Sequence, residues 1–302
     1  MNTNGNIYTV VYSTIIVVLV AAVLAFASSA LKPMQDANIK AETISQMLDA
    51  AGIQSKDTPA TNEQLLDIYV ENIAEAFVID GSGNKTGSLS TDRSNIELED
   101  GLKAQNTNIV KEANVSLPVY VFKNGTTVIP VYGAGLWGPV WGYIAFDEDL
   151  RTISGAYFDH GSETPGLGAK IKDDPAFRAL FKGRKADFEA SPVFAIVKGA
   201  SAENEVDAIT GATMTSKGLS AAIGTWLKAY APYFTANSQP AKHKCNCGRF
   251  CPCGEACECD CHYHPGQTAC ECDCHCHPGQ TACECPGCAC QNCPTGSHKM
   301  EE

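Results

Sequence analysis

The sequence predicts an α+β fold: one N-terminal transmembrane helix, then a largely antiparallel sheet with flanking helices, then a non-globular, cysteine-rich tail. Three observations support this prediction. The chain opens with an uncharged apolar run, strand-like segments follow one another in its middle, and all 16 cysteines lie from Cys245 onward. We therefore divide the 302 residues into a membrane anchor (1–31), a helical or irregular membrane-proximal region (32–112), a folded domain (113–234) and a linker with the tail (235–302).

The membrane anchor is predicted from its lack of charge. Tyr8 to Leu31 is almost wholly apolar or small, and about 20 such residues span a bilayer as a helix that satisfies its own backbone groups. The alternative is a cleaved signal peptide, because the run Ala27-Ser28-Ser29-Ala30 is typical of a cleavage site. The long apolar run without a basic start favours an uncleaved anchor. Lys32 and Lys40 follow the run, and the positive-inside rule slightly favours a cytoplasmic body.

Helices are predicted on both sides of the strands. One amphipathic helix ends at Gly52, and the next begins at Thr61, which forms a capping-box pattern with Gln64. A short helix is expected to start at Asp174, and the last helix is expected to start near Thr215.

Strands are predicted where short runs rich in β-branched and aromatic residues lie between turn signals. The predicted strands are 118–122, 126–132, 141–146, 152–158 and 192–197. Residues 80–112 are polar, and we expect an irregular surface excursion there. Strands in succession, with the helices set apart from them, favour an antiparallel sheet.

The composition also argues against several classes of function. The formal net charge of −12 argues against a nucleic-acid partner, which requires a basic face. Residues 32–234 contain no recognisable nucleophile–base triad, metal triad or phosphate loop.

One stretch of small residues leads into the last predicted helix. It reads Asp207-Ala-Ile-Thr210-Gly211-Ala212-Thr213-Met-Thr215-Ser. The free N–H groups and the dipole at a helix N-terminus favour an anion such as a phosphate. Gly211 and Ala212 leave room for a bulky group, and Thr213 offers a hydroxyl that can be esterified. Ordinary N-capping by Thr or Ser is the alternative, and the stretch taken alone favours it.

This stretch resembles the flavinylation motif of the FMN-binding domain family, and in particular of the C subunits of sodium-translocating NADH:quinone reductases. That motif is an acid, two residues, Ser or Thr, Gly-Ala-Thr, and another Ser or Thr two residues on, and residues 207–215 match it throughout. Two further blocks are similar to the family: Glu163-Thr164-Pro165-Gly166-Leu167-Gly168, and Gly135-Leu136-Trp137. The resemblance covers about residues 5–232, with the blocks in the expected order behind one anchor.

The resemblance implies that FMN is joined through its phosphate to Thr213, by a dedicated flavin transferase that uses FAD. The chain would then relay electrons in the reductase, with the other membrane subunits of the complex and membrane lipid as partners. The implied cofactor-binding residues are Thr213, Gly211, Ala212, Thr210, Asp207, Glu163, Thr164, Gly166, Leu167 and Gly168. It also implies a single pass through the inner membrane with the body on the periplasmic side, which overrides the two lysines.

The tail has a composition of its own. A 13-residue unit rich in Cys and His begins at Ala256 and again at Ala269, and no Leu, Ile or Val occurs from Cys245 on, so the tail cannot build an apolar core. Thiolate and imidazole ligands suit Zn or Cu(I). Disulfides, or a disordered tail with little function, are the alternatives. The candidate ligands are Cys257, Cys259, Cys261, His262, His264, Cys270, Cys272, Cys274, His275 and His277.

Two other functions stay open on the sequence alone. An Rnf-type ferredoxin:NAD reductase has a flavoprotein subunit that shares the anchor, the Glu163–Gly168 block and the Thr motif. The long segment before the strands and the Gly-Leu-Trp block favour the quinone reductase. The other function is that of a membrane-tethered metal-binding protein, with the tail as the working part and the body as its scaffold.

Overall fold

The computed structural model describes residues 6–99 and 101–238, so the cysteine-rich tail and its candidate metal ligands lie outside the described residues. The helices are α1 (Asn6–Ala50), α2 (Asn62–Asn72), α3 (Leu102–Val110), α4 (Lys170–Asp173), α5 (Pro175–Ala179) and α6 (Thr213–Asn237). The strands are β1 (Ile73–Ile79), β2 (Lys85–Ser88), β3 (Leu117–Phe122), β4 (Thr127–Ala134), β5 (Pro139–Phe146), β6 (Ile153–His160), β7 (Ala195–Val197) and β8 (Glu205–Asp207).

One six-stranded antiparallel sheet forms the centre of the body, in the order β2-β1-β3-β4-β5-β6. Strands β3 to β6 form a meander, as their close spacing in the sequence predicts. The short strands β7 and β8 pair in parallel and form a separate sheet. The observed fold therefore agrees with the predicted α+β class and its largely antiparallel sheet.

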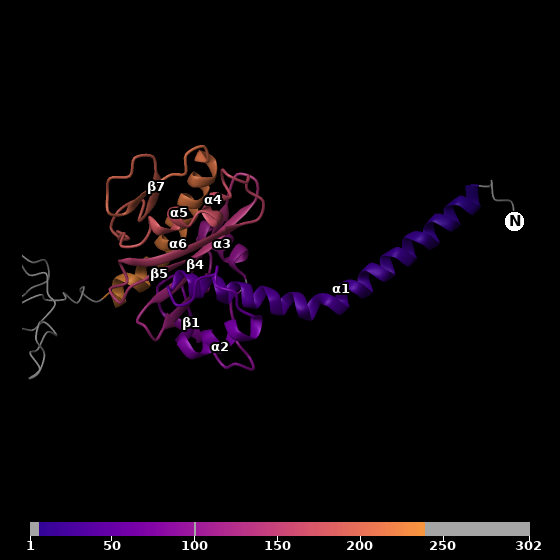
Figure 1. Ribbon diagram of the computed structural model, residues 1–302, viewed down its shortest axis with the longest axis horizontal. Coiled ribbons are helices and arrows are strands. Elements are labelled where there is room, and N and C mark those ends of the chain that lie inside the picture. The colour runs from indigo at the N-terminus through magenta and orange to yellow at the C-terminus, as the bar shows by residue number, and fades with distance from the viewer. Residues whose placement is uncertain (1–5, 100, 239–302) are drawn as a thin grey trace, which may run out of the picture.

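The central sheet is covered on both faces, and each face has its own core. Trp226 of α6 packs in one cluster with Val119 and Ile129, whose side chains point to that face. Tyr120 and Val128, the neighbours of these two residues, belong to the other cluster, where α1 and α2 cover the sheet. Figure 1 shows α6 and α2 on opposite sides of the sheet. Double coverage explains why β3 and β4 are buried at nearly every position.

Helix α1 joins the predicted anchor to the body. It is one continuous helix of 45 residues, so the anchor and the helix expected to end at Gly52 are parts of a single element. Within the described residues, it is the helix that is long and apolar enough to cross a membrane. Its first part is exposed, whereas the segment from Ala41 on is buried against the sheet. Figure 1 shows the exposed part as a long rod that leaves the body.

The region between α2 and β3 differs from the prediction. The capping box is confirmed, because the Thr61 hydroxyl accepts from the N–H of Gln64 and the Gln64 side chain accepts from the N–H of Thr61. The helix nevertheless ends at Asn72, and Ile73–Ile79 is strand β1. The expectation of an irregular excursion over 80–112 was wrong for β2 and α3. Pairing with β1 and packing against α6 outweigh the weak local pattern of these polar segments.

Candidate functional site

The start of α6 is a helix N-terminus without a side-chain cap. Its N-cap residue is Ala212, whose side chain offers no hydrogen bond, and its first turn holds no acidic residue. The first N–H groups of a helix have no acceptor within the helix, and the helix dipole adds to their attraction for an anion. Gly211 has a φ of +82°, a conformation that favours glycine, and it turns the chain into the helix. The structure therefore places an uncapped helix N-terminus at the motif, which is the arrangement that favours an anion.

The hydroxyl side chains of this segment differ in exposure. Thr215 and Ser216 are each 1% exposed. The Thr215 hydroxyl donates to Glu163 Oε2 at 2.6 Å, and the Ser216 hydroxyl accepts from a backbone N–H at 3.1 Å. Thr210 and Thr213 are both exposed, but Thr213 is the first residue of α6 itself. Thr213 is therefore the accessible hydroxyl that lies beside the free N–H groups of the helix.

Glu163 lies beneath the first turn of α6, and it is only 5% exposed. Besides the Thr215 hydroxyl, its carboxylate accepts from the N–H of Trp137 at 2.9 Å and from the N–H groups of Leu136 and Gly138. Burial raises the pKa of Glu163, but these hydrogen bonds outweigh burial and hold its pKa below the ordinary value of 4.5. The carboxylate is therefore ionised at neutral pH and is directed into the body.

The surface around the start of α6 is apolar. Leu136 is 47% exposed, Trp137 67%, Leu167 43% and Met214 57%. A Cβ placed on Gly211 would lie 3.1 Å from Leu167 Cδ2, so the Leu167 side chain lies against the turn before α6. Exposed apolar side chains gathered on one surface mark a binding site. The four exposed side chains suit a flat, largely apolar ring held close to the N-terminus of α6.

The loop after β6 owes its shape to its backbone. The Thr164 carbonyl accepts from the N–H groups of Leu167 and Ala169 at 3.1 and 3.0 Å. Gly166 has a φ of +74°, which the turn requires. His160 Nδ1 accepts from the N–H of Glu163 at 3.1 Å and closes the start of the loop. Thr164 and Gly166 thus shape the turn that leaves the Leu167 side chain on the surface.

Asp207, the acid of the Thr motif, forms hydrogen bonds to the backbone of a neighbouring loop. Its carboxylate accepts from the N–H groups of Gly199 and Ala200 at 2.9 and 3.1 Å. These bonds close the loop that follows β7 and bring that loop to the segment before α6. The structure thus brings Glu163, Gly168 and Thr215 together, whereas Asp207 shapes the approach to the helix.

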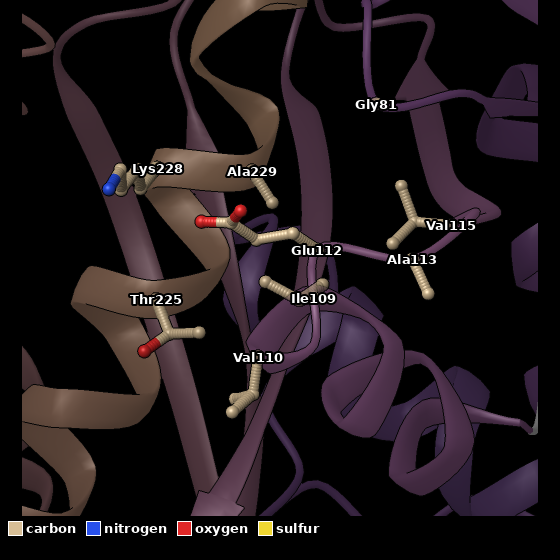
Figure 2. A pocket seen from close by; sticks show the side chains of 9 residues that line it. All are labelled: Gly81, Ile109, Val110, Glu112, Ala113, Val115, Thr225, Lys228 and Ala229. Carbon is tan, nitrogen blue, oxygen red and sulfur yellow. The ribbon is translucent and has the colours of Figure 1, made fainter.

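A separate cavity lies further along α6, and no residue of the three motif blocks is among its lining residues. Figure 2 shows it between the end of α3 and the C-terminal half of α6. Its volume is about 480 Å³, and Thr225, Lys228 and Glu112 are among its lining residues. Thr225 lies 12 residues beyond Thr213 on α6, or about 18 Å along the helix axis. Within the described residues, no group of three His, Cys, Asp or Glu side chains could hold a metal ion.

The predicted cofactor-binding residues omitted several positions that the structure adds, namely Thr215, Leu136, Trp137, Gly135, Gly138 and Met214. Gly135 and Gly138 flank Leu136-Trp137, and their segment supplies N–H donors to Glu163. Met214 adds to the exposed apolar surface. The glycines on both sides of a Leu-Trp pair were a signal for a close backbone approach. No local pattern pointed to Met214.

Comparison with known proteins relates this geometry to a family. The family model described as "FMN-binding domain" matches residues 135–228, a span that contains Glu163 and Thr213. The C subunit of the Na(+)-translocating NADH-quinone reductase of Vibrio vulnificus is 30% identical over 218 residues, which cover 68% of this chain and 84% of that protein. Its counterpart in Pasteurella multocida is 33% identical over 242 residues, with 72% and 90% covered.

A solved structure agrees with these relatives. The crystal structure of the C subunit of the Na(+)-translocating NADH-quinone reductase from Parabacteroides distasonis matches with a TM-score of 0.57 and 33% identity, covering 70% of this chain and 98% of that one. Fold, motifs and relatives point the same way. The chain therefore belongs to the family of the C subunits of Na⁺-translocating NADH-quinone reductases, and it is a subunit of an oxidoreductase complex.

Proposed function

We propose that this chain carries FMN in a phosphoester to Thr213 and relays electrons within a Na⁺-translocating NADH:quinone reductase. The observation that carries the proposal is the position of Thr213, an exposed hydroxyl on the first residue of a helix without a side-chain cap. The hydroxyls of Thr215 and Ser216 are buried and already hydrogen-bonded. The match to an FMN-binding domain over residues 135–228 supports the identity of the cofactor.

The attachment would follow from a flavin transferase that uses FAD. The Thr213 Oγ1 forms a bond to the phosphorus of the FMN half, the bond to the AMP half breaks, AMP leaves, and the hydroxyl proton is released. The free N–H groups at the start of α6 would hold the phosphate oxygens. Leu167, Trp137 and Met214 offer the apolar surface for the ring. The bound FMN supplies the electron transfer, and these residues place it.

The location of the chain belongs to the same proposal. Helix α1 is long and apolar enough to anchor the body in the inner membrane in a single pass. The family relationship supports a periplasmic body, with the other membrane subunits of the complex and lipid as its partners. The flavin transferase is a further, transient partner.

The attachment site is tested by comparing Thr213 with another exposed threonine of α6. Thr213→Ala should abolish flavin fluorescence in the denatured protein band, because only that hydroxyl is esterified, while the domain stays folded. Thr235→Ala is the matched control, because Thr235 is also exposed on α6 but lies outside the motif, and it should keep the fluorescence. Intact mass should show one FMN adduct in the control and none in Thr213→Ala. A fluorescent Thr213→Ala band would disprove the assignment.

The alternative functions predict different measurements. All of the relatives named above are quinone reductase subunits, which favours that complex over an Rnf-type reductase, and the neighbouring genes test this choice. If the tail holds Zn or Cu(I), deleting residues 245–302 should remove bound metal and leave the covalent FMN intact. Metal analysis and flavin fluorescence on one preparation distinguish a tethered metal-binding protein from a flavoprotein.

A further inference from the structure

Three segments that are far apart in the sequence meet at the carboxylate of Glu163. The loop after β4 donates backbone N–H groups to it, from Trp137 at 2.9 Å and from its neighbours Leu136 and Gly138. The first turn of α6 donates the Thr215 hydroxyl at 2.6 Å. Glu163 itself lies in the loop after β6. Each of the three recognised sequence blocks thus supplies one side of the same contact.

Two glycines of these blocks make room for that carboxylate. A Cβ on Gly135 would lie 2.4 Å from Glu163 Oε1, and a Cβ on Gly168 would lie 2.5 Å from Glu163 Oε2 and 2.6 Å from Thr215 Oγ1. Neither glycine is among those with a positive φ, so close approach rather than backbone conformation explains glycine here. The blocks are therefore built around the Glu163 side chain, and not only around the surface above it.

The contact is made to an acceptor with no proton of its own. The Thr215 hydroxyl donates to Glu163 Oε2, and the Trp137 N–H donates to Glu163 Oε1. A carboxylate accepts both bonds at once, whereas an amide accepts on one side only, and the Thr215 hydroxyl would then have to turn and accept from the amide N–H. Hydrogen bonds to an ionised acceptor are the strong ones. The charge therefore matters as well as the shape.

We infer that Glu163 is a positioning residue for flavin attachment. It holds the Leu136-Trp137 loop and the first turn of α6 in a fixed relative position, so that Thr213 and the apolar surface face the same ligand. This inference rests on the proposed attachment of FMN at Thr213. Glu163 acts through Thr215 and through the loop, and it does not touch the flavin itself. Without the Glu163 carboxylate, the Leu136-Trp137 loop and the first turn of α6 lose their shared hydrogen-bond acceptor. The sheet and α6 still keep their apolar core.

The test measures the rate of flavin attachment in the purified full chain, made without flavin, with flavin transferase and FAD added. Glu163→Gln and Thr215→Val should each slow attachment about tenfold or more, because the first removes the charge of the shared acceptor and the second removes a hydroxyl that donates to it. The double variant should be no slower than the slower single variant, because both substitutions break one contact. Thr215→Ser keeps the hydroxyl and should restore the rate to within about twofold of the wild type.

The chain offers a matched control at the opposite end of β6. The Asp149 carboxylate accepts from the Thr152 hydroxyl at 2.6 Å and from the N–H groups of Arg151 and Thr152 at 2.9 and 2.8 Å. Asp149→Asn and Thr152→Val therefore break the same kind of contact outside the site, and they should leave the attachment rate unchanged. If Glu163→Gln fails to show a cooperative thermal transition, Thr215→Val and its Ser counterpart decide.

Distinct results would overturn the inference. Wild-type attachment rates in Glu163→Gln and Thr215→Val would do so, as would equal slowing in the Asp149 and Thr152 variants, or a Thr215→Ser protein as slow as Thr215→Val. Failure of the proposed function looks different: the wild-type chain would take up no flavin, or Thr213→Ala would take it up.

Discussion

At the scale of single residues, the site depends on how closely side chains approach one carboxylate. Gly168 illustrates this, because its missing side chain leaves the Glu163–Thr215 hydrogen bond intact. Thr213 and Leu167 could be predicted from the resemblance, since each lies in a contiguous motif. The Glu163–Thr215 pair could not, because 52 positions separate the two residues and no local pattern records their contact.

The substitution Gly168→Ala should therefore damage the site. The new Cβ would stand within 2.6 Å of both bonded oxygens, and we expect a loss of about 1–3 kcal/mol of stability together with slower flavin attachment. Gly224→Ala is the matched control. Gly224 lies within α6, and the atom nearest to its added Cβ, the Phe194 carbonyl oxygen, is 3.8 Å away. It should raise the thermal midpoint, since Ala is the better helix former. A neutral Gly168→Ala would contradict the described packing.

The lowered pKa of Glu163 gives a second prediction at this scale. A group whose pKa is depressed on folding adds stability above its unfolded value, and this stability is lost as pH falls through the folded value. The difference in thermal midpoint between the wild type and Glu163→Gln should thus be constant well above pH 4.5 and should shrink below it. A difference that grows in acid would contradict this sign.

At the scale of elements, α1 is held to the sheet by a buried polar contact as well as by its apolar face. The Gln46 side chain donates to Asp159 Oδ2 at 3.0 Å, and Lys172 pairs with Asp159 Oδ1 at 2.9 Å. Local patterns predicted the meander and the capping box at Thr61. They missed β1, because Ile73 continues the helical spacing of Tyr69 and no Gly or Pro separates α2 from the strand.

This contact contrasts with an exposed ion pair within α1. Asp159 is 4% exposed, whereas the Lys172 side chain is 36% exposed, so Asp159→Asn should lower stability by about 1–3 kcal/mol, because a buried acceptor of bonds from Gln46 and Lys172 loses its charge. Asp36, paired with Lys32 at 3.3 Å, is largely exposed, and Asp36→Asn should change stability by less than about 1 kcal/mol. Chemical denaturation of both variants measures the difference. Equal effects would show that Asp159 does not fasten α1.

At the scale of the whole molecule, the chain is an apolar rod joined to a body whose sheet is covered on both faces. The α+β class could be predicted because the strands of the meander follow one another in the sequence. The continuity of α1 from Asn6 to Ala50 could not, because the apolar run ends at Leu31 and no local pattern shows that the helix continues past Lys32 and Pro33. The buried contacts of the later turns, from Ala41 on, stabilise the helix across that segment.

The orientation of the body is tested with the tail cysteines as reporters. If the body is periplasmic, a membrane-impermeant thiol reagent should label the reduced tail in whole cells whose outer barrier is opened. Intact mass should show that the N-terminal segment is retained, because an uncleaved anchor keeps the whole of α1. The truncated chain that lacks residues 245–302 has no cysteine and should remain unlabelled. Labelling only after lysis of the inner membrane would place the body in the cytoplasm.

The continuity of α1 has a further consequence for assembly. Each residue of a helix adds about 1.5 Å of length and rotates the remainder of the chain by about 100° around the helix axis. The number of residues between Leu31 and Ala41 therefore fixes both the height of the body above the bilayer and the direction that it faces. One residue inserted there would turn the start of α6 by about 100° relative to the apolar part of α1. Seven inserted residues, about two turns, would restore the direction while raising the body by about 10 Å.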